Sequence, residues 1–326
     1  MFKSVSIVIP ALNEEKNIAK CVRAIAAIDR CSLDIETIVI DNGSTDRTVE
    51  IARALGARVL VKSGVNVAEV RNYGVRHSGG ELLAFVDADC VVAKDWLREA
   101  LNTIEKESAD AVGSFHVIPA EAGWIGRTAE LIQHKKVGND VRYIPSGNLI
   151  VKRSCFEAIG GFKASLETSE DVDLSIRLKD SGCKLFLDPK ISSVHLGSPM
   201  SIGEMFKREM WHGKAMWPAF IRDIRSGKPL RSARNLRLVL YSSINLLLII
   251  GIIGTLYPLY QGQPVPLLVS SVLYLLLNLT VALNDWRRLR KNLLQLFGYC
   301  AIYGVARSIS VLRWLVSGAP GMQSKP

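Results

Sequence analysis

The residues best suited to chemistry in this chain are the two carboxylates of Asp87-Ala88-Asp89. They follow an apolar run at residues 82–86 that has the composition of a buried strand. Carboxylates at the end of such a strand need a cation or water to replace lost solvation, and alternation keeps both near one ion. Mg²⁺ and Mn²⁺ prefer such oxygen ligands and also bind phosphate oxygens. The triplet therefore indicates metal-assisted chemistry on a phosphate ester, although Asp-x-Asp is also common in ordinary turns.

The segment that precedes this triplet alternates between short β-rich runs and helical patterns. The expected strands are 5–9, 35–40, 58–61 and 82–86, and the expected helices between them are 16–28, 46–55 and 67–77. Such a series builds a mostly parallel sheet flanked by helices, and ligands collect at the carboxyl ends of its strands. The pattern predicts an α/β domain over residues 1–200 with a binding crevice at one edge of the sheet.

Polar residues follow the expected strands at positions where they would line that crevice. Asp41 directly follows the second strand, where its carboxylate can accept a hydrogen bond from a nucleobase N–H. The next residues are also typical of a turn, with Ser44 or Thr45 capping the following helix. Asn13 and Glu14 likewise have the composition of a helix start, with Asn13 as its cap. Each segment therefore has both a structural and a ligand-binding interpretation.

Common nucleotide-binding loops are absent from the sequence. Neither GxGxxG nor GxxxxGK[ST] occurs, which argues against a dinucleotide enzyme and a P-loop phosphotransferase. A bound diphosphate would then be held by a metal and by side chains. The six cysteines show no CxxC pair and no metal-ligand spacing, so we expect them to be reduced and mostly buried.

The C-terminal part of the chain has a different composition. Segments 238–260 and 265–283 contain no Asp, Glu, Lys or Arg, and each is long enough to span a bilayer. A third segment, 293–316, carries Arg307 and Arg313, and it either spans or lies in the interface with its arginines reaching the headgroups. The sequence therefore predicts α-helical membrane segments over residues 238–316, followed by a tail at 317–326.

The net charge of +10 is concentrated beside these apolar segments. Residues 201–237 combine a helical pattern with a basic linker, and we expect an amphipathic interfacial helix there or one that packs on the domain. Basic residues also follow the second span, whereas the loop between the spans has none, so the positive-inside rule places residues 1–237 in the cytoplasm. Membrane lipids or an anionic lipid-linked substrate explain this charge better than nucleic acid.

Taken together, the motifs of residues 4–200 resemble those of the family 2 glycosyltransferases, which are inverting enzymes of the GT-A fold. The ordered motifs are Pro10-Ala11-Leu12-Asn13-Glu14, Asp41-Asn42-Gly43-Ser44-Thr45-Asp46, Val70-Arg71-Asn72-Tyr73-Gly74, Asp87-Ala88-Asp89, Gly160-Gly161-Phe162 and Glu170-Asp171. Val70 replaces the Ala that is usual in the family. The order and spacing of the motifs are more specific than any one of them.

The resemblance implies a role for each motif. Asp171 would be the catalytic general base with Glu170 beside it, and Ser169 is expected to cap their helix, at about 170–180. Asp87 and Asp89 would bind the metal, whereas His195 either completes the metal sphere or is structural. The implied nucleotide-sugar site consists of Pro10, Ala11, Asn13, Glu14, Asp41, Arg71, Asp87 and Ala88.

The expected reaction is the inverting transfer of a single sugar from a UDP- or GDP-linked donor, with Mg²⁺ or Mn²⁺, to a lipid-linked or glycan acceptor. Processive members of the family carry Gln-x-x-Arg-Trp where this chain has residues 207–211, so a polymer synthase is not expected. Two alternatives are a nucleotidyltransferase and a non-catalytic, membrane-tethered nucleotide-sugar binding protein. Sugar and acceptor contacts are expected within 115–165, with Trp124, His134, Tyr143 and Asn148 as candidates.

Overall fold

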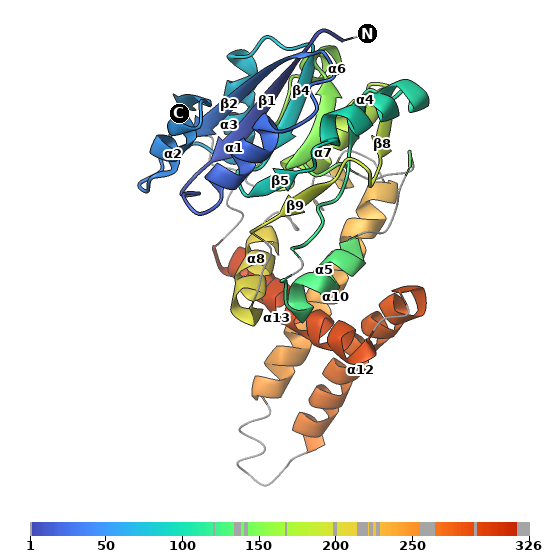
Figure 1. Cartoon of the computed structure of the whole chain (residues 1–326). Helices are drawn as coiled ribbons and strands as arrows, with labels where there is room; N and C mark the ends of the chain where they lie inside the picture. Colours follow the sequence, from blue (N-terminus) through green and yellow to red (C-terminus); the bar gives the residue numbers. More distant parts are fainter. Residues whose placement is uncertain are drawn as a thin grey trace. The chain divides into compact units, whose positions relative to one another are not determined.

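The computed structural model describes residues 2–119, 121–133, 138–139, 143–166, 168–197, 201–213, 221, 224–225, 229–254, 265–289 and 292–317. These residues form two compact units (Figure 1). Unit 1 consists of Met1–Glu121 and Gln133–Ser198, and unit 2 of Ala122–Ile132 and Pro199–Pro326. Residues 122–132, which the sequence places in the first domain, group with unit 2 because their apolar side chains pack with later helices.

Unit 1 is built on a seven-stranded sheet with the order β3-β2-β1-β4-β7-β6-β8. Strands β1 to β4 run parallel, as expected, whereas β7 runs antiparallel to both β4 and β6. A separate small sheet pairs β5 with β9. The strands are β1 Ser4–Ala11, β2 Asp34–Asp41, β3 Arg58–Val61, β4 Leu82–Val86, β5 Cys90–Val92, β6 Ala111–Gly113, β7 Asn148–Lys152, β8 Leu185–Leu187 and β9 Ser193–His195.

The helices of unit 1 are α1 Ile18–Ala26, α2 Thr48–Ala54, α3 Val67–Arg76, α4 Trp96–Glu107, α6 Arg153–Ala158 and α7 Glu170–Asp180. The expected helix caps are partly wrong. Asn17 rather than Asn13 precedes α1, and Arg47 rather than Ser44 or Thr45 precedes α2. The reason is that Asn13 and Ser44 hydrogen-bond across the two loops, where the N–H of Asn13 donates to Ser44 Oγ and Asn13 Oδ1 accepts from the N–H of Thr45.

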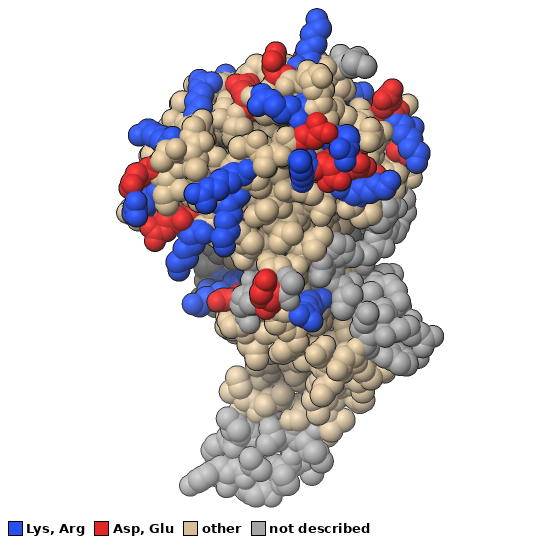
Figure 2. Space-filling model, viewed as in Figure 1, with Lys and Arg blue, Asp and Glu red and all other residues tan. Residues whose placement is uncertain are grey.

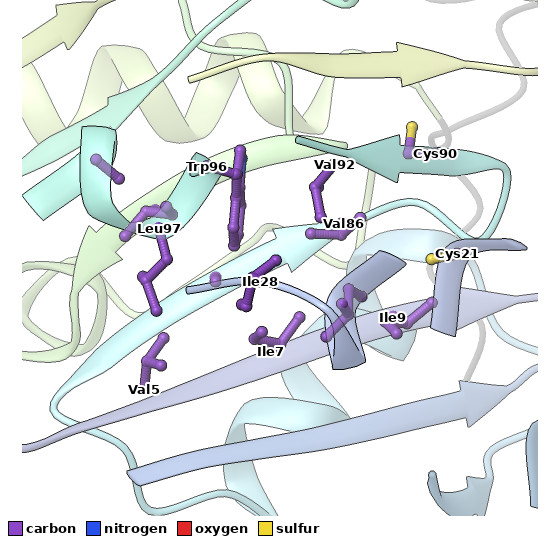
Figure 3. Close-up of a cluster of buried hydrophobic side chains, with 14 of the residues drawn as sticks. Val5, Ile7, Ile9, Cys21, Ile28, Val86, Cys90, Val92, Trp96 and Leu97 are labelled. Atoms are coloured by element: carbon purple, nitrogen blue, oxygen red, sulfur yellow. The ribbon is translucent and has the colours of Figure 1, made fainter. Parts of the chain in front are cut away.

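The core of unit 1 lies on both faces of the sheet because side chains alternate along each strand. Val5, Ile7 and Ile9 of β1 lie on one face, where they pack with Trp96 and Leu97 of α4 (Figure 3). The opposite face buries Val8 of β1 together with residues of α3, α6 and α7. Two covered faces fix the register of β1, because a slip of one residue would exchange its two apolar sets.

The strand register brings the predicted functional segments to one edge of the sheet. Ala11, at the end of β1, pairs with Asp41, at the end of β2, and Asp41 pairs in turn with Val61. Val86, at the end of β4, pairs with Asn148, the first residue of the antiparallel β7. We call this the donor edge. The segment before β7 also reaches it, although it comes about 60 residues after β4 in the sequence.

Unit 2 is helical and consists of α5 Trp124–Gln133, α8 Ile202–Gly213, α10 Pro229–Gly254, α12 Val265–Leu289 and α13 Leu293–Ser317. Met205 of α8 is buried against Ile125 and Tyr299, which favours the packing interpretation of this helix. Arg307 pairs with Glu209 at 2.7 Å, so the expectation that it reaches lipid headgroups is wrong. Within the described ranges, no helix combines the length and the apolarity needed to cross a bilayer, and residues 255–260 of the first predicted span lie outside them.

Candidate active site

Asp41 forms one end of the site. Its side chain is almost completely buried, and its Oδ2 accepts hydrogen bonds from the backbone N–H groups of Gly43, at 2.9 Å, and Ser44, at 3.0 Å. Its Oδ1 is also buried but has no hydrogen-bond partner among the described residues. An unpaired buried carboxylate oxygen costs free energy, and native sites usually satisfy it with a ligand or water. The position and chemistry of Oδ1 therefore suit the N–H of a nucleobase.

Asn13 joins the first two loops of the donor edge. Its backbone N–H donates to Ser44 Oγ at 2.9 Å, and its Oδ1 accepts from the backbone N–H of Thr45 at 2.9 Å. Asn13 has a φ of +56°, a left-handed conformation that Asn tolerates better than most residues. Ala11 contributes its carbonyl oxygen to the N–H of Asn42, whereas Pro10 precedes it in β1. The side chain of Asn13 thus shapes the nucleotide loop.

Glu14 lies close enough to the acidic triplet to be affected by it. Burial raises the pKa of its carboxyl group, and the charges of Asp89 and Asp87 raise this pKa further. The Nδ2 of Asn17 donates to Glu14 Oε2 at 2.9 Å and opposes that rise. The structure thus brings together Glu14 and the triplet, which are more than 70 residues apart in the sequence.

Asp89 and His195 form the candidate metal centre. Antiparallel pairing of β5 with β9 sets Cys90 opposite His195, and His195 Nε2 lies 3.4 Å from Asp89 Oδ2. One ligand atom each from Asp89, Cys90 and His195 lies within 4.8 Å of the other two. Burial raises the pKa of Asp89, His195 opposes this rise and Asp87 adds to it. A divalent cation would relieve this excess of buried negative charge.

Two glycines pack closely against these carboxylates. A Cβ at position 197 would overlap Asp89 Oδ2, and one at position 147 would overlap Asp87 Oδ2. Both positions therefore require close backbone approach to a carboxylate oxygen. The carboxylate of Asp89 suits Mg²⁺ or Mn²⁺, and the imidazole of His195 is an acceptable ligand for Mn²⁺. Asp87 does not join the compact set that contains Asp89, since that set consists of Asp89, Cys90 and His195 within the described part of the chain.

Arg71 links the acidic triplet to the pair Glu170-Asp171. Its side chain is 3% exposed, Nη2 donates to Asp87 Oδ1 at 2.7 Å, and Nη1 donates to Glu170 Oε1 at 2.8 Å. Burial alone would raise the pKa of Asp87, but the Arg71 guanidinium and then His116 hold it below its usual value. The resemblance had implied a place for Arg71 near the nucleotide. The structure instead commits both terminal nitrogens of Arg71 to carboxylates of the site.

Asp171 lies in the first turn of α7. Burial, with the adjacent charge of Glu170, raises the pKa of its carboxyl group to about 7, despite a hydrogen bond to Oδ1 from the Val172 N–H at 2.7 Å. A carboxyl group with this pKa can exchange a proton near neutral pH. The expected cap is wrong, because Ser169 has a φ of +64° and its side chain makes no capping hydrogen bond. The helix itself covers the expected range.

His116 is a residue that sequence reasoning missed. Its ring centroid lies 5.2 Å from that of His195, and its Nδ1 lies 3.4 Å from Ser193 Oγ. Bridging of Val117 to Val194 holds this segment beside β9. His116 follows the end of β6 by only three positions. Its place after a short apolar run was the one sequence signal that could have marked it as a candidate site residue. It brings a second imidazole to the candidate metal centre.

Four residues were expected from the sequence to contact the sugar or the acceptor, and the three that the structure describes are divided between the two units. Asn148 is fully buried, accepts from Trp96 Nε1 at 2.7 Å and donates to the Ile191 carbonyl oxygen at 2.8 Å, so it supports the core and its expected contact role is wrong. Trp124 belongs to unit 2, and Tyr143 makes an edge-to-face contact with Phe115 in unit 1. His134 lies outside the described residues.

Comparison with known proteins identifies the family of this chain. The family model "Glycosyl transferase family 2" matches residues 6–164. The "Glycosyltransferase AglE" of Haloferax volcanii is 30% identical over 231 residues, which cover 67% of this chain and 75% of the relative. The chain belongs to glycosyl transferase family 2. It is therefore a glycosyltransferase that uses nucleotide sugars, and this membership replaces both alternative functions considered from the sequence.

Two further proteins are similar to this glycosyltransferase at lower identity. The "Pre-mycofactocin glycosyltransferase" of Mycobacterium tuberculosis is 24% identical over 247 residues, and the chain spans 50% of its length. A mannosyltransferase from Pyrobaculum calidifontis, solved with GDP-Man and Mn²⁺, has a TM-score of 0.65 and 18% identity over 96% of this chain and 87% of its own. That likeness shows the GT-A fold.

Arg71 gives a first test of the site in this glycosyltransferase. Arg71→Met removes the guanidinium group that pairs with both Asp87 and Glu170, so we expect the free energy of unfolding to fall by about 3 kcal/mol. Urea unfolding followed by circular dichroism measures this loss. Arg76→Met is the matched control, since Arg76 is 53% exposed on the same helix and should change stability by less than about 0.5 kcal/mol. Equal effects of the two substitutions would contradict the bridging role.

Gly197 gives a second test. The added Cβ of Gly197→Ala would overlap Asp89 Oδ2 and lie 3.1 Å from His195 Cε1, so it must displace one of them. We expect Mn²⁺ affinity to fall by about 10-fold to 100-fold, by analogy with losses from disturbed metal-site support. Electron paramagnetic resonance of free Mn²⁺ gives the affinity directly. Gly79→Ala, where a Cβ would meet nothing within 4 Å, should bind as the unchanged protein does.

Proposed function

We propose that this family 2 glycosyltransferase transfers a single sugar, with inversion, from a UDP- or GDP-linked donor to a lipid-linked or glycan acceptor, and that it depends on a divalent cation. The observation that carries the proposal is the Arg71 bridge. One buried guanidinium contacts both Asp87, in the acidic triplet, and Glu170, beside the candidate base. The groups that bind a leaving diphosphate and a reacting hydroxyl are thereby brought into one site.

Two parts of the site bind the donor: one contacts the nucleobase and the other holds the cation that contacts the diphosphate. Asp41 Oδ1 accepts an N–H of the base, and the loops joined by Asn13 surround it. Asp89 and His195 hold the cation, with Asp87 close by and shared with Arg71. A cation bound there would supply Lewis-acid stabilisation of the charge that develops on the leaving diphosphate. The Pyrobaculum mannosyltransferase, which binds GDP-Man with Mn²⁺, supports this assignment through its shared fold.

Asp171 acts on the acceptor. Its carboxylate takes the proton of the attacking hydroxyl while the acceptor oxygen forms its bond to the anomeric carbon on the face opposite the diphosphate. Glu170 does not compete for this proton, because its Oε1 accepts from Arg71 Nη1 at 2.8 Å and from Ser146 Oγ at 3.3 Å. A single displacement of this kind inverts the anomeric configuration.

The pH dependence of turnover follows from the raised pKa of Asp171. The carboxyl group works as a base only when deprotonated, and below its pKa of about 7 the protonated form increases. We therefore expect kcat with a hydroxyl acceptor to fall about tenfold for each pH unit well below 7 and to level off above it. Measurement of kcat from pH 5 to pH 9 checks this. The acid limb should disappear in Asp171→Asn, and its persistence there would assign it to another group.

Donor and acceptor can be identified in one experiment. Membranes that contain the protein are incubated with a panel of UDP- and GDP-sugars labelled in the sugar, and the lipid-extractable and aqueous products are separated. We expect one donor to give a transferred product, in the organic phase for a lipid-linked acceptor and in the aqueous phase for a glycan. Membranes with Asp89→Ala are the control, because loss of the metal ligand should affect both acceptor classes. Hydrolysis of donors without transfer, under all conditions, would contradict the proposal.

We also propose that unit 2 attaches the enzyme to the cytoplasmic face of a membrane. Its interior contains buried polar groups besides its apolar clusters, since Asn245, Asn278 and Ser308 are fully buried and Asn278 Nδ2 donates to Asn245 Oδ1 at 3.2 Å. Charged side chains gather on unit 1, and the visible described face of the helices is mostly uncharged (Figure 2). Large apolar side chains are exposed along the three long helices, including Leu240, Ile244, Leu247, Ile250, Ile253, Val272, Leu273, Leu275, Leu276 and Leu315.

Exposed apolar side chains around buried and hydrogen-bonded amide groups suit a lipid environment, because lipid tails pack against apolar side chains but cannot form hydrogen bonds with amides. Cell fractionation tests the attachment. We expect the protein to remain in the membrane pellet after washes with high salt and with alkaline carbonate. Release by salt alone would indicate an electrostatic association and would contradict attachment through the apolar side chains.

A further inference from the structure

A second group of metal-ligating side chains lies in unit 1, away from the donor edge. One ligand atom each from Asp110, Cys155 and Cys183 lies within 4.8 Å of the other two. They come from three separate segments of the chain. Asp110 directly precedes β6, Cys155 belongs to α6 and Cys183 comes shortly before β8. All three side chains are half-buried, so an ion from solvent can reach them. The proposed transfer reaction uses none of them.

The strand register places this group at the opposite edge of the sheet. Lys152, at the end of β7, pairs with Leu82, the first residue of β4, and Ala111 pairs with Leu185, the first residue of β8. The donor edge lies at the other end of β4, which is about 16 Å away for a strand of this length. The group is therefore distinct from the centre formed by Asp89 and His195.

We propose that Asp110, Cys155 and Cys183 bind a thiolate-preferring divalent cation such as Zn²⁺. Zn²⁺ takes Cys sulfur at about 2.3 Å and carboxylate oxygen at about 2.0–2.2 Å in a tetrahedral arrangement, with ligand atoms roughly 3.5–3.8 Å apart. In the structure the three ligand atoms lie within 4.8 Å of one another. Small side-chain adjustments would therefore bring them to the separations that the ion requires. Water would complete the fourth position.

The charge and hydrogen bonding around the group suit a divalent ion. Lys152 Nζ lies 2.8 Å from Asp110 Oδ1, and the backbone N–H of Lys184 donates to Asp110 Oδ2 at 2.9 Å. These partners orient the carboxylate as supporting hydrogen bonds do in metal sites. Two thiolates and one carboxylate with one ammonium group leave a local charge of −2, which the cation neutralises.

Binding must release the thiol protons. Burial, together with Cys183, raises the pKa of the Cys155 thiol to about 11, so this thiol is protonated at neutral pH without metal. Each sulfur exchanges its proton for a bond to the cation, and no atom changes oxidation state. The affinity is therefore expected to rise with pH. The high pKa also disfavours the thiolate that oxidation to a disulfide would require.

The site would connect the two helices that flank the acceptor-side motifs. Cys155 lies in α6, which precedes Gly160-Gly161, and the N–H of Cys183 donates to the Leu178 carbonyl oxygen near the end of α7. Asp171 lies in the first turn of that same α7. A bound ion would thus fix the far end of the helix that carries the candidate base. We expect stabilisation of unit 1 without direct participation in catalysis.

Cadmium titration of the purified full chain tests the proposal. The protein is treated with a chelator and kept in a phosphine reductant, and Cd²⁺ binding is followed by the ultraviolet charge-transfer band of Cd²⁺–thiolate bonds. We expect Cys155→Ser and Cys183→Ser each to weaken that binding by at least about 100-fold. Cys31→Ser is the matched control, since Cys31 is half-buried outside the cluster, and it should leave the binding unchanged.

Further measurements decide between the remaining outcomes. Zn²⁺ should raise the melting temperature of the unchanged protein and of Cys31→Ser by more than that of the two cluster variants, in which, among the described residues, only the centre at Asp89 and His195 remains. Far-ultraviolet circular dichroism shows that each variant is folded. Asp110→Asn, which keeps both thiols, should weaken Cd²⁺ binding by about tenfold. A thiolate band that keeps its full intensity and its Cd²⁺ affinity in both cluster variants would overturn the proposal, whereas a weaker residual band from Cys90 at the donor edge would not. A Cys155–Cys183 disulfide found by mass spectrometry in protein isolated without reductant would also overturn it.

Discussion

Replacement of Asp171 by Asn is expected to lower kcat with a hydroxyl acceptor by about 10²–10⁴-fold, the usual contribution of a positioned general base. The amide keeps the shape of the side chain but cannot take the proton of the attacking hydroxyl. Donor binding should change little, because Asp41 and the metal centre are untouched. Steady-state kinetics with purified enzyme give kcat, and nucleotide binding by calorimetry gives the donor affinity.

Asp180→Asn is the matched control for this substitution. Asp180 ends the same helix α7 and is exposed, so its replacement removes one carboxylate without affecting the site, and kcat should stay within about twofold. A loss below tenfold in Asp171→Asn with a hydroxyl acceptor would contradict the role of a base. A polyprenyl phosphate acceptor carries an ionised nucleophile that needs no base. The size of the loss therefore also reports the acceptor class.

Replacement of Asp89 by Ala is expected to lower kcat/KM by about 10²–10³-fold, the scale on which loss of one electrostatic stabiliser acts. The substitution removes the carboxylate that faces His195 Nε2 at 3.4 Å and leaves the metal centre without its charged ligand. Mn²⁺ affinity should fall in parallel. Electron paramagnetic resonance of free Mn²⁺ measures that affinity without dependence on turnover.

Asp95→Ala is the control for the metal centre. Asp95 lies six residues further on, is 47% exposed and pairs with Arg98 at 3.5 Å on the surface, so its loss should alter neither activity nor Mn²⁺ binding. If Asp89→Ala bound Mn²⁺ as tightly as the unchanged protein, another group would have to hold the cation. His116 would then be the first residue to replace, because its ring lies 5.2 Å from that of His195.

The elements of the first half were predictable because their signals are local. Alternating apolar runs and helical periodicity predicted β1 to β4 and the helices between them, and parallel pairing then followed from the connections. Asp41 and the acidic triplet could be placed at one edge by this reasoning alone. The ends of helices were less predictable, because residues 13–15 and 44–48 use their capping groups on each other.

The later part of unit 1 was less predictable because its strands are short and pair out of order. β6 and β8 have three residues each, too few for a clear periodicity, and β7 enters the sheet between β4 and β6 in the antiparallel direction. This insertion buries Asn148, which the sequence had suggested as a contact residue. Residues 122–132 leave unit 1 because their apolar face packs with unit 2.

By itself the sequence determined the family resemblance and the order of the candidate site residues, since these follow from motifs whose spacing is set along the chain. Only the tertiary structure decided that Arg71 joins Asp87 to Glu170, that His116 stands beside His195, and that two cysteines meet Asp110 at the opposite edge. Arg71 and Glu170 are 99 residues apart. Contacts at such separations depend on strand order, register and burial, which arise when the chain packs and leave no local pattern.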